Sequence, residues 1–369
     1  MFPRRIDSER SLSVMRVWGH TTVAACATLA LAGSALATLA APARAAPAHA
    51  APEAAADRTA ARCDRTCLEG LVEQYLGALF AHDPARLSMT ADVRFTENGQ
   101  QLELGEGLWR TVSGKGTFHL IVPDEAAGEV AWLGSIREAG TPAMLALRLG
   151  VRGRRIAEIE TLVQRSDRSA LGFEKIGYRW TEVIPPAERM SRDDLVHIAN
   201  LYFSGVQLND GKGVYPFAPD CNRIENGTFT TNAPTPPGQK RPDPRTANMY
   251  SAQWSCLEQF KSGLIHFVTR VRDRRFVAVD PQHGVAFAFG FFDHAAGDTR
   301  TFQTPDGRTV TAGPKVPWTW ELAETFRIEH GKIHQIMAIM NHVEYGMNSG
   351  WSTWEQGRSD RARYLGQNY

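Results

Sequence analysis

Glu324 is the residue whose type and position most suggest catalysis, because this carboxylate lies inside an alternating apolar run near the C-terminus. That run and the next one flank residues 329–332 (Glu-His-Gly-Lys), and an X-Gly pair between two alternating runs predicts a tight hairpin turn. A two-residue turn puts Glu324 on one face with Leu322 and Phe326. Met337 is then expected directly across the hairpin. These apolar neighbours should raise the pKa of the carboxyl, which suits a general base that acts near neutral pH.

The same register places two amides, Gln335 and Asn341, on the face of Glu324. Two interpretations stay open: an amide satisfies the carboxylate inside a closed core, or Glu324 faces a ligand cavity. In the second interpretation, Glu324 is the base and Asn341 polarises the substrate. Tyr202 or Asp293 would assist. Each also has a structural interpretation, because Tyr202 suits helix packing and Asp293 suits a strand end that turns into a loop.

Aromatic and apolar side chains would form the wall of such a cavity. The strand expected at 285–292 carries phenylalanines at alternate positions, so they share one face with Asp293 while His294 lies opposite. The side chains expected to contact a ligand are Trp320, Phe287, Phe289, Phe291, Met337, Trp254 and Tyr250.

Four further carboxylates receive no catalytic role. Glu158 and Glu160 would face inward in an earlier hairpin, unless a one-residue bulge turns them outward. Glu97 and Glu225 each precede an Asn-Gly pair and are interpreted as strand-to-turn residues.

Motifs for cofactors, metals and common nucleophiles are absent from the sequence. It has no Gly-x-Ser-x-Gly, His-Glu-x-x-His, phosphate loop or dinucleotide fingerprint, so no cofactor is expected. Cys63 and Cys67 lack a nearby histidine pair, and His342 and Glu344 lack a third ligand. No metal site is therefore expected.

Two helices and two sets of strands should position these residues. A helical stripe with Asp64 as its cap predicts a helix over 64–80, and a capping box at 191–194 begins a second helix that carries Tyr202. His82-Asp83-Pro84 ends the first helix, and Asn209-Asp210-Gly211 ends the second 127 residues later. The Glu-Asn-Gly motif recurs at an offset of 128 residues. Each helix is followed by antiparallel strand candidates, so the sequence predicts a duplicated α+β fold.

The domain boundaries follow from this repeat and from the N-terminal segment. Basic residues, an Ala/Leu run and Ala43-Arg44-Ala45 predict a signal peptide over 1–45, with cleavage after Ala45 or, second, after Ala50. A lipobox-like Cys26 is the less favoured alternative. After it we expect a disordered leader over 46–62, a first domain over 63–165, a linker over 166–190, and a second domain over 191–369 with a Pro-rich insertion at about 228–252. The chain should be secreted or periplasmic.

The near-zero net charge limits the classes of partner, and the number of cysteines indicates the compartment. The formal net charge of +1 gives no electrostatic footprint for nucleic acid, and no apolar run of membrane-spanning length follows the leader. A small molecule or a protein partner remains. Four cysteines follow the leader, and an exported chain with an even count suggests disulfides. Of three pairings, we expect Cys63–Cys67 with Cys221–Cys256, because each bond stays within one repeat.

Each repeat of about 100 residues resembles the SnoaL-like branch of the NTF2-like superfamily. The resemblance rests on a helix that ends in His/Asn-Asp, a Glu-Asn-Gly strand, and two long closing strands joined by an X-Gly turn. It implies two tandem cones, in each of which a bent antiparallel sheet wraps a long helix around a pocket. The cones would pack through their outer sheet faces, where the expected apolar residues are Ile159, Val163, Ile336 and Met340.

The resemblance also implies a set of functions without choosing one. Members of the superfamily include dehydratases, isomerases, polyketide cyclases, lyases and plain binding domains. We therefore expect a cofactor-free lyase, dehydratase or isomerase that acts on a small, partly aromatic or polyketide-like ligand in the second cone. The alternative is a non-catalytic ligand-binding or protein-interaction module. The two cones would form a pseudo-dimer within one chain, which leaves homo-oligomers open.

Overall fold

The computed structural model describes residues 62–177 and 179–364, in a mixed α+β arrangement. The predicted signal peptide and nearly all of the leader lie outside these residues. All the described residues belong to one unit of the chain, Pro52–Tyr369. No helix in this described part is long and apolar enough to cross a membrane.

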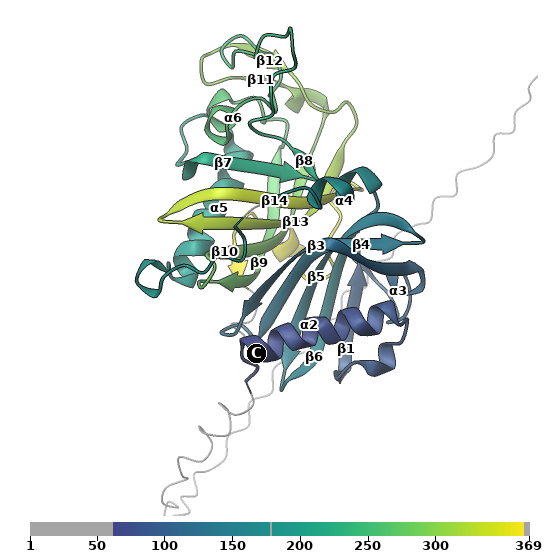
Figure 1. The fold of residues 1–369 in the computed structure, drawn as a ribbon. Helices are drawn as coiled ribbons and strands as arrows, with labels where there is room; N and C mark the ends of the chain where they lie inside the picture. Colours follow the sequence, from purple (N-terminus) through teal and green to yellow (C-terminus); the bar gives the residue numbers. More distant parts are fainter. Residues whose placement is uncertain (1–61, 178, 365–369) are drawn as a thin grey trace, which may run out of the picture. The chain divides into compact units, whose positions relative to one another are not determined.

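The first half consists of a long helix and a six-stranded sheet (Figure 1). The elements are α2 (Arg65–Phe80), β1 (Met89–Glu97), β2 (Gln100–Gln101), α3 (Leu108–Thr111), β3 (Val112–Asp124), β4 (Glu129–Glu138), β5 (Thr141–Arg152) and β6 (Arg155–Gln164). The strands follow the order β2-β1-β6-β5-β4-β3, and only the β1–β6 pair is parallel. The short helix α4 (Asp167–Phe173) leads out of this half.

The second half repeats this strand order and adds a strand at one edge. It also has two excursions from the sheet, which are the Pro-rich insertion and a segment that forms a small two-stranded sheet. Its main elements are α5 (Arg192–Leu208), β7 (Phe217–Glu225), β8 (Thr228–Phe229), β9 (Arg270–Asp280), β10 (Val285–His294), β13 (Trp318–Glu329), β14 (Lys332–Val343) and β15 (Arg363–Tyr364). The order is β8-β7-β14-β13-β10-β9-β15, and β7 pairs with β14 in parallel as β1 pairs with β6. The excursions and the C-terminal segment carry α6 (Cys256–Ser262), β11 (Thr301–Gln303), β12 (Thr309–Thr311) and α7 (Trp354–Arg358).

Local sequence explains where the two long helices begin and end. The Asp64 side chain accepts a hydrogen bond from the Cys67 amide, and the Ser191 side chain accepts one from the Asp194 amide. Asn209 ends α5 in the left-handed region at φ 39°, a conformation that asparagine tolerates better than most residues. Each helix buries an apolar stripe against the inner face of its own sheet.

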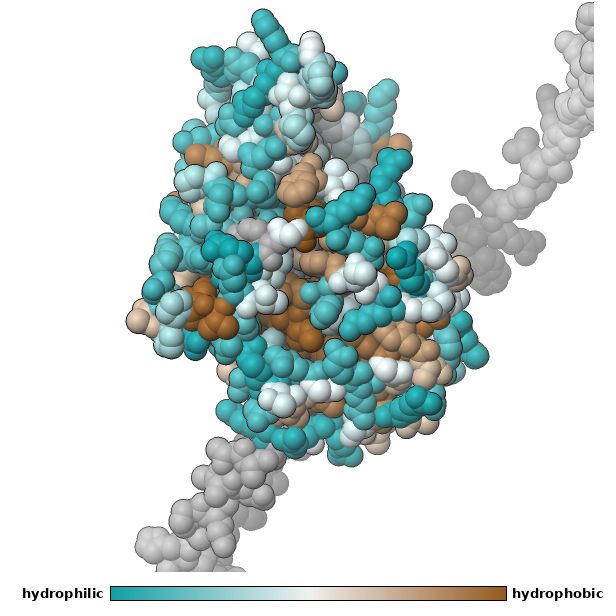
Figure 2. All heavy atoms as spheres, in the orientation of Figure 1, coloured by the Kyte–Doolittle hydropathy of each residue, from teal (hydrophilic) through white to brown (hydrophobic). Residues whose placement is uncertain are grey.

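The outer faces of the two sheets share a third apolar core. Residues of β3, β4, β5 and β6 pack there with residues of β7, β9, β10, β13 and β14, together with Ala170 and Phe173 of α4. Both faces of each sheet are therefore buried over much of their area. On the face shown in Figure 2, mainly hydrophilic side chains lie at the surface, with small hydrophobic patches between them.

Polar contacts join the halves in reciprocal positions. Arg65, at the start of α2, contacts Asp280 at the end of β9, with 2.6 Å between Nη2 and Oδ1. Arg192, at the start of α5, contacts Asp124 at the end of β3 in the same way. Such an exchange of equivalent contacts is the pattern of a two-fold interface.

The last hairpin has the two-residue turn that the sequence predicts, but its register differs beyond the turn. Glu329 pairs with Lys332, and His330 and Gly331 have φ values of 48° and 73°. A bulge at His334 then shifts the pairing by one residue, so Glu324 lies opposite Ala338. The shift places Ile336 and Met340 on the face of Glu324. The sequence prediction that Met337, Gln335 and Asn341 share this face is wrong.

The first hairpin contains the same kind of bulge, at Ala157. It turns Glu160 to the outer face, where its carboxylate binds the Arg275 guanidinium with distances of 2.6 and 2.8 Å. Ile159 and Val163 consequently lie in the inner core of the first half. The expectation that Ile159, Val163, Ile336 and Met340 form the outer contact is wrong, because one extra residue per hairpin inverts the faces.

Both predicted disulfides are confirmed. The Cα atoms of Cys63 and Cys67 are 5.2 Å apart, and those of Cys221 and Cys256 are 6.1 Å apart. The second bond ties β7 to the start of α6, on either side of the Pro-rich insertion. Disulfides are compatible with an extracellular or periplasmic location.

Candidate functional site

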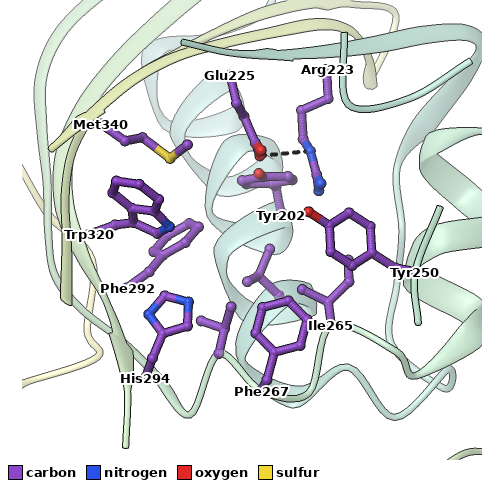
Figure 3. A pocket seen from close by; sticks show the side chains of 12 residues that line it. Tyr202, Arg223, Glu225, Tyr250, Ile265, Phe267, Phe292, His294, Trp320 and Met340 are labelled. Atoms are coloured by element: carbon purple, nitrogen blue, oxygen red, sulfur yellow. Dashed lines mark ion pairs between the residues drawn. The ribbon is translucent and has the colours of Figure 1, made fainter. Parts of the chain in front are cut away.

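A cavity in the second half lies between the inner face of the sheet, helix α5 and the segment that follows α6 (Figure 3). The cavity volume is about 60 Å³. The lining side chains are Tyr202, Val206, Arg223, Glu225, Tyr250, Ile265, Phe267, Val268, Phe292, His294, Trp320 and Met340. This set combines an aromatic wall with one charged pair and two phenols, which is the usual composition of a small-molecule site.

Glu324 lies on the inner face of β13, behind the cavity lining. It is 1% exposed, and its Oε2 atom has no hydrogen-bond partner among the residues that the structure describes. Burial raises the pKa of Glu324 to about 8, and the negative charge of Glu225 adds to this increase. The Tyr202 hydroxyl and Arg223 oppose it only in part. The carboxyl is therefore mostly neutral at pH 7 and can donate a hydrogen bond.

Tyr202 connects Glu324 to the cavity. Its ring comes from α5 and packs edge-on against Phe326 of β13, with 5.3 Å between the ring centroids. The hydroxyl is buried and lacks a well-aligned hydrogen-bond partner in the described part of the chain. Burial, and then the nearby charge of Glu324, holds the pKa of Tyr202 well above its usual value. Tyr202 is therefore a neutral donor at physiological pH.

Arg223 and Glu225 supply the charge in the cavity. They lie two residues apart on β7, so both side chains point to the same face, and Arg223 Nε is 2.9 Å from Glu225 Oε1. Figure 3 shows both groups turned towards the same part of the cavity as Tyr202 and Tyr250. The Glu-Asn-Gly pattern indicates Glu225 only as a strand-to-turn residue. The alternation of Arg223 and Glu225 was the signal that could have revealed the pair.

His294 supplies a second neutral polar group, on the aromatic wall. Its ring stacks on Trp318 with 4.0 Å between centroids, and Phe267 lies 5.9 Å away on a nearly parallel plane. Burial lowers the pKa of His294 to about 4. The Nδ1 atom has no hydrogen-bond partner among the described residues. A neutral imidazole nitrogen is thus left for a ligand or a water molecule.

Three of the predicted site residues meet at this cavity. Tyr202, Trp320 and Tyr250 line it, and Tyr250 reaches it from the Pro-rich insertion. Trp254 lies instead in a separate small core with Leu264, and its indole nitrogen donates to the Pro242 carbonyl over 2.7 Å. The expectation that Trp254 contacts a ligand is therefore wrong for this cavity.

Asp293 and the alternating phenylalanines lie on the outer face of β10, away from the cavity. The Asp293 carboxylate binds Arg272 over 2.8 Å and accepts a hydrogen bond from the Thr319 hydroxyl over 2.7 Å. Phe287 and Phe289 pack in the core between the sheets, and Phe291 lies under the guanidinium of Arg272. The predicted alternation is present, but the cavity face is the one that carries Phe292 and His294.

Asn341 and Met337 are also on the outer face. Asn341 donates from Nδ2 to the Val163 carbonyl of the first half over 2.9 Å. Met337 packs in the core between the sheets. The bulge at His334 is the physical reason, since a shift of one residue moves every later side chain of the strand to the other face. Neither side chain can therefore contact a ligand beside Glu324.

The first half provides a natural comparison for the site. Leu147 opposite Thr161 occupies the place that Glu324 opposite Ala338 occupies in the second half. Tyr75 corresponds to Tyr202, and its ring contacts Trp109 edge-on at 5.3 Å. The first half therefore has an aliphatic side chain where the second half buries an acid.

Among the described residues, no group of three or more His, Cys, Asp or Glu side chains is placed to hold a metal ion. The polar groups at the cavity are two phenols, one imidazole, one indole, one guanidinium and one carboxylate. This set can donate to, and accept from, an uncharged polar ligand.

Residues 188–340 match a domain of unknown function (DUF8021). This segment contains every residue that lines the cavity. No curated protein matches the chain. Similar solved structures include a de novo designed protein with a curved β-sheet, which is 16% identical with a TM-score of 0.23 over 41% of this chain and 88% of that chain. AclR, a proposed hydroxylase from Streptomyces galilaeus, is 12% identical with a TM-score of 0.24 over 41% of this chain and 91% of that chain.

Proposed function

We propose that the second half binds a small, partly aromatic carbonyl compound and catalyses proton transfer on it, as a lyase, dehydratase or isomerase. The observation that carries the proposal is the buried carboxyl of Glu324, with a pKa of about 8, behind the buried Tyr202 hydroxyl at a cavity wall. Among the described residues, its Oε2 atom has no hydrogen-bond partner. Uncompensated buried acids are costly, and they concentrate at functional sites.

The two carboxyl groups of the site suit opposite roles. Glu225 lines the cavity beside Arg223 and would accept a proton from a carbon next to the substrate carbonyl. Tyr202 would donate a hydrogen bond to the carbonyl oxygen as negative charge develops there, with neutral Glu324 behind it to supply a proton. Return of the proton to another carbon completes an isomerisation. Loss of a β-hydroxyl as water completes a dehydration.

This assignment differs from the role that the sequence suggested for Glu324. A carboxyl with a pKa of about 8 is mostly protonated at neutral pH, so Glu324 suits the acid and Glu225 suits the base. His294 and Trp320 would bind the ring of the substrate, since a neutral imidazole and an indole offer contact without charge.

We also propose that both halves are NTF2-like domains of the SnoaL-like type, arranged as tandem cones, in an exported chain. The repeated strand order and the long helix on each inner face support this assignment. The first half would serve mainly as the packing partner, because Leu147 replaces the acid.

Deuterium incorporation tests the catalytic function. A panel of small cyclic ketones and enones is incubated with the protein in D2O, and exchange next to the carbonyl is followed by NMR. The wild-type protein should accelerate exchange for some members, and Glu225→Gln and Tyr202→Phe should each reduce the rate about 100-fold. Glu324→Leu copies the first half and should lose exchange while remaining folded. Glu344→Gln, at an exposed residue, should exchange like the wild type.

A non-catalytic binding domain is the second candidate. The largely aromatic lining of the cavity favours it, because such a wall would hold a ring without any chemistry. Ligands that raise the melting temperature, with no deuterium exchange for any member of the panel, would select this candidate over the enzyme.

A further inference from the structure

A second hollow adjoins the cavity on its outer side. Its volume is about 290 Å³, and its lining comprises Met249, Tyr250, Phe267, Arg300, Thr311, Ala312 and Gly313. Tyr250 and Phe267 also line the inner cavity. Their rings lie 5.9 Å apart, so these two side chains form the partition between the inner cavity and the outer hollow.

The partition is held by the two excursions of the second half. Tyr250 belongs to the Pro-rich insertion and packs against a small core that contains Phe302 and Val310. These two residues belong to the paired strands β11 and β12, which we call the β11–β12 flap. Gly313 follows the flap and touches Phe267, since a Cβ atom at Gly313 would lie 2.4 Å from the Phe267 Cβ. With φ at 91°, the position also suits glycine alone. The close approach therefore fixes the Phe267 ring against the flap.

Arg300 gives the outer hollow its charge. It is the one ionisable side chain of the lining apart from the Tyr250 phenol, and it is only partly exposed. Its Nε atom donates to the Gly313 carbonyl over 3.2 Å, which orients the guanidinium at the hollow. Arg300 forms no ion pair with any residue in 62–177 or 179–364. A partly buried guanidinium without a carboxylate partner is suited to an anionic ligand group.

We propose that the outer hollow is a second binding subsite, which takes the carboxylate tail of an elongated ligand whose ring occupies the inner cavity. The linker between the two ends would lie against Tyr250 and Phe267, and this contact would select ligands by the width and length of that linker. The proposal rests on the proposed small-molecule function of the inner cavity. It adds the substrate class: an aryl or cyclic ketone with an acidic side chain.

Matched ligands test the subsite. The probes are phenol, a series of 4-hydroxyphenyl alkanoates with chains of increasing length, and the corresponding uncharged amides, with affinities measured by calorimetry. One chain length should bind the wild-type protein best. At that length the carboxylate should bind about fivefold more tightly than its amide. Arg300→Gln should abolish this preference and leave phenol binding unchanged.

Two further variants separate the subsite from general effects of charge and packing. Arg245→Gln removes an exposed guanidinium of the Pro-rich insertion, outside the outer hollow, and should keep the carboxylate preference. Phe267→Ala should widen the partition and weaken the dependence on chain length. Equal affinity for carboxylates and amides, with phenol still bound, would overturn the subsite alone. If phenol and the whole series fail to bind, the subsite is wrong, and deuterium exchange with the ketone panel decides the proposed function separately.

Discussion

At the scale of single residues, the site keeps two titratable groups neutral because their pKa values are shifted in opposite directions. Burial raises the pKa of Glu324 to about 8 and lowers the pKa of His294 to about 4. Both side chains are 1% exposed, so water cannot restore the charged forms. Near pH 7 the ion pair of Arg223 and Glu225 is consequently the main charge that a ligand in the cavity would meet.

Glu324→Gln should stabilise the protein at alkaline pH. The folded-state pKa of Glu324 is raised, so its carboxyl is compatible with folding at low pH and destabilises the fold as pH rises through about 8. An increase from 4.5 to about 8 corresponds to at most roughly 4–5 kcal/mol at pH 9. Chemical denaturation at pH 5 and pH 9 checks this. The variant should lose less stability between the two pH values than the wild type, and equal losses would contradict the burial of an acid.

His294→Phe should change the pH dependence of stability at acidic pH. A histidine with a depressed folded-state pKa stabilises the fold above about pH 6.5 and loses that contribution as pH falls towards 4. The phenylalanine ring keeps the stacking on Trp318 and cannot be protonated. The wild type should lose roughly 2–3 kcal/mol more than the variant between pH 7 and pH 4. Parallel pH profiles of the two proteins would show that His294 is already solvated.

At the scale of elements, two bulges decide which side chains meet the cavity. Each closing hairpin has one extra residue, Ala157 in the first half and His334 in the second. These bulges let Glu324 face inward while Asn341 reaches the first half. The Pro-rich insertion then adds Tyr250, and the segment that follows α6 adds Phe267.

The disulfide between Cys221 and Cys256 should contribute more to stability than the one between Cys63 and Cys67. The Cys221–Cys256 bond closes a loop of 35 residues, and the Cys63–Cys67 bond closes a loop of 4. Replacement of Cys221 and Cys256 by alanine should cost about 2–4 kcal/mol. It should also open the insertion to limited proteolysis between residues 233 and 250. Replacement of Cys63 and Cys67 is the control, and an equal or larger loss of stability in that control would contradict the loop argument.

How far the sequence predicts these elements depends on the physical signal behind each one. The turn at His330 and Gly331, the helix caps and the disulfide pairing follow from local chemistry, and they are present. The register beyond the turn does not follow from local chemistry, because no residue type indicates the bulge at His334. The sequence prediction of which side chains of β10 face the cavity is also wrong. Both of its faces are buried, one against α5 and one against the other sheet, so apolar alternation cannot distinguish them.

At the scale of the molecule, the halves exchange equivalent contacts around a shared core. The reciprocal pairs Arg65–Asp280 and Arg192–Asp124 lie at its margin, and the pair of Arg275 and Glu160 lies within it. Glu321 is close by, and burial together with the charge of Glu160 raises its pKa to about 8. The interface therefore depends on Arg275 to compensate buried carboxylates from both halves.

Arg275→Met should destabilise the whole described unit, because it leaves Glu160 buried without its main partner. The expected cost is about 3 kcal/mol or more. Adding Glu160→Gln should recover most of the loss, since the uncompensated charge is then removed. Arg152→Met breaks an exposed pair with Asp92 and should change stability little. Denaturant titrations of the three variants and the wild type measure this. A double variant no more stable than Arg275→Met would contradict the charge argument.

The most direct measurement of the central claim is the titration of the Glu324 carboxyl carbon by ¹³C NMR, with Glu324→Gln to assign the signal. The claim is that this acid stays neutral near pH 7 behind the binding cavity. The midpoint should lie near pH 8. It should move when a ligand contacts Tyr202, since the two groups share one environment. A midpoint below about pH 5, the range of an ordinary solvated glutamate, would contradict the acid role of Glu324.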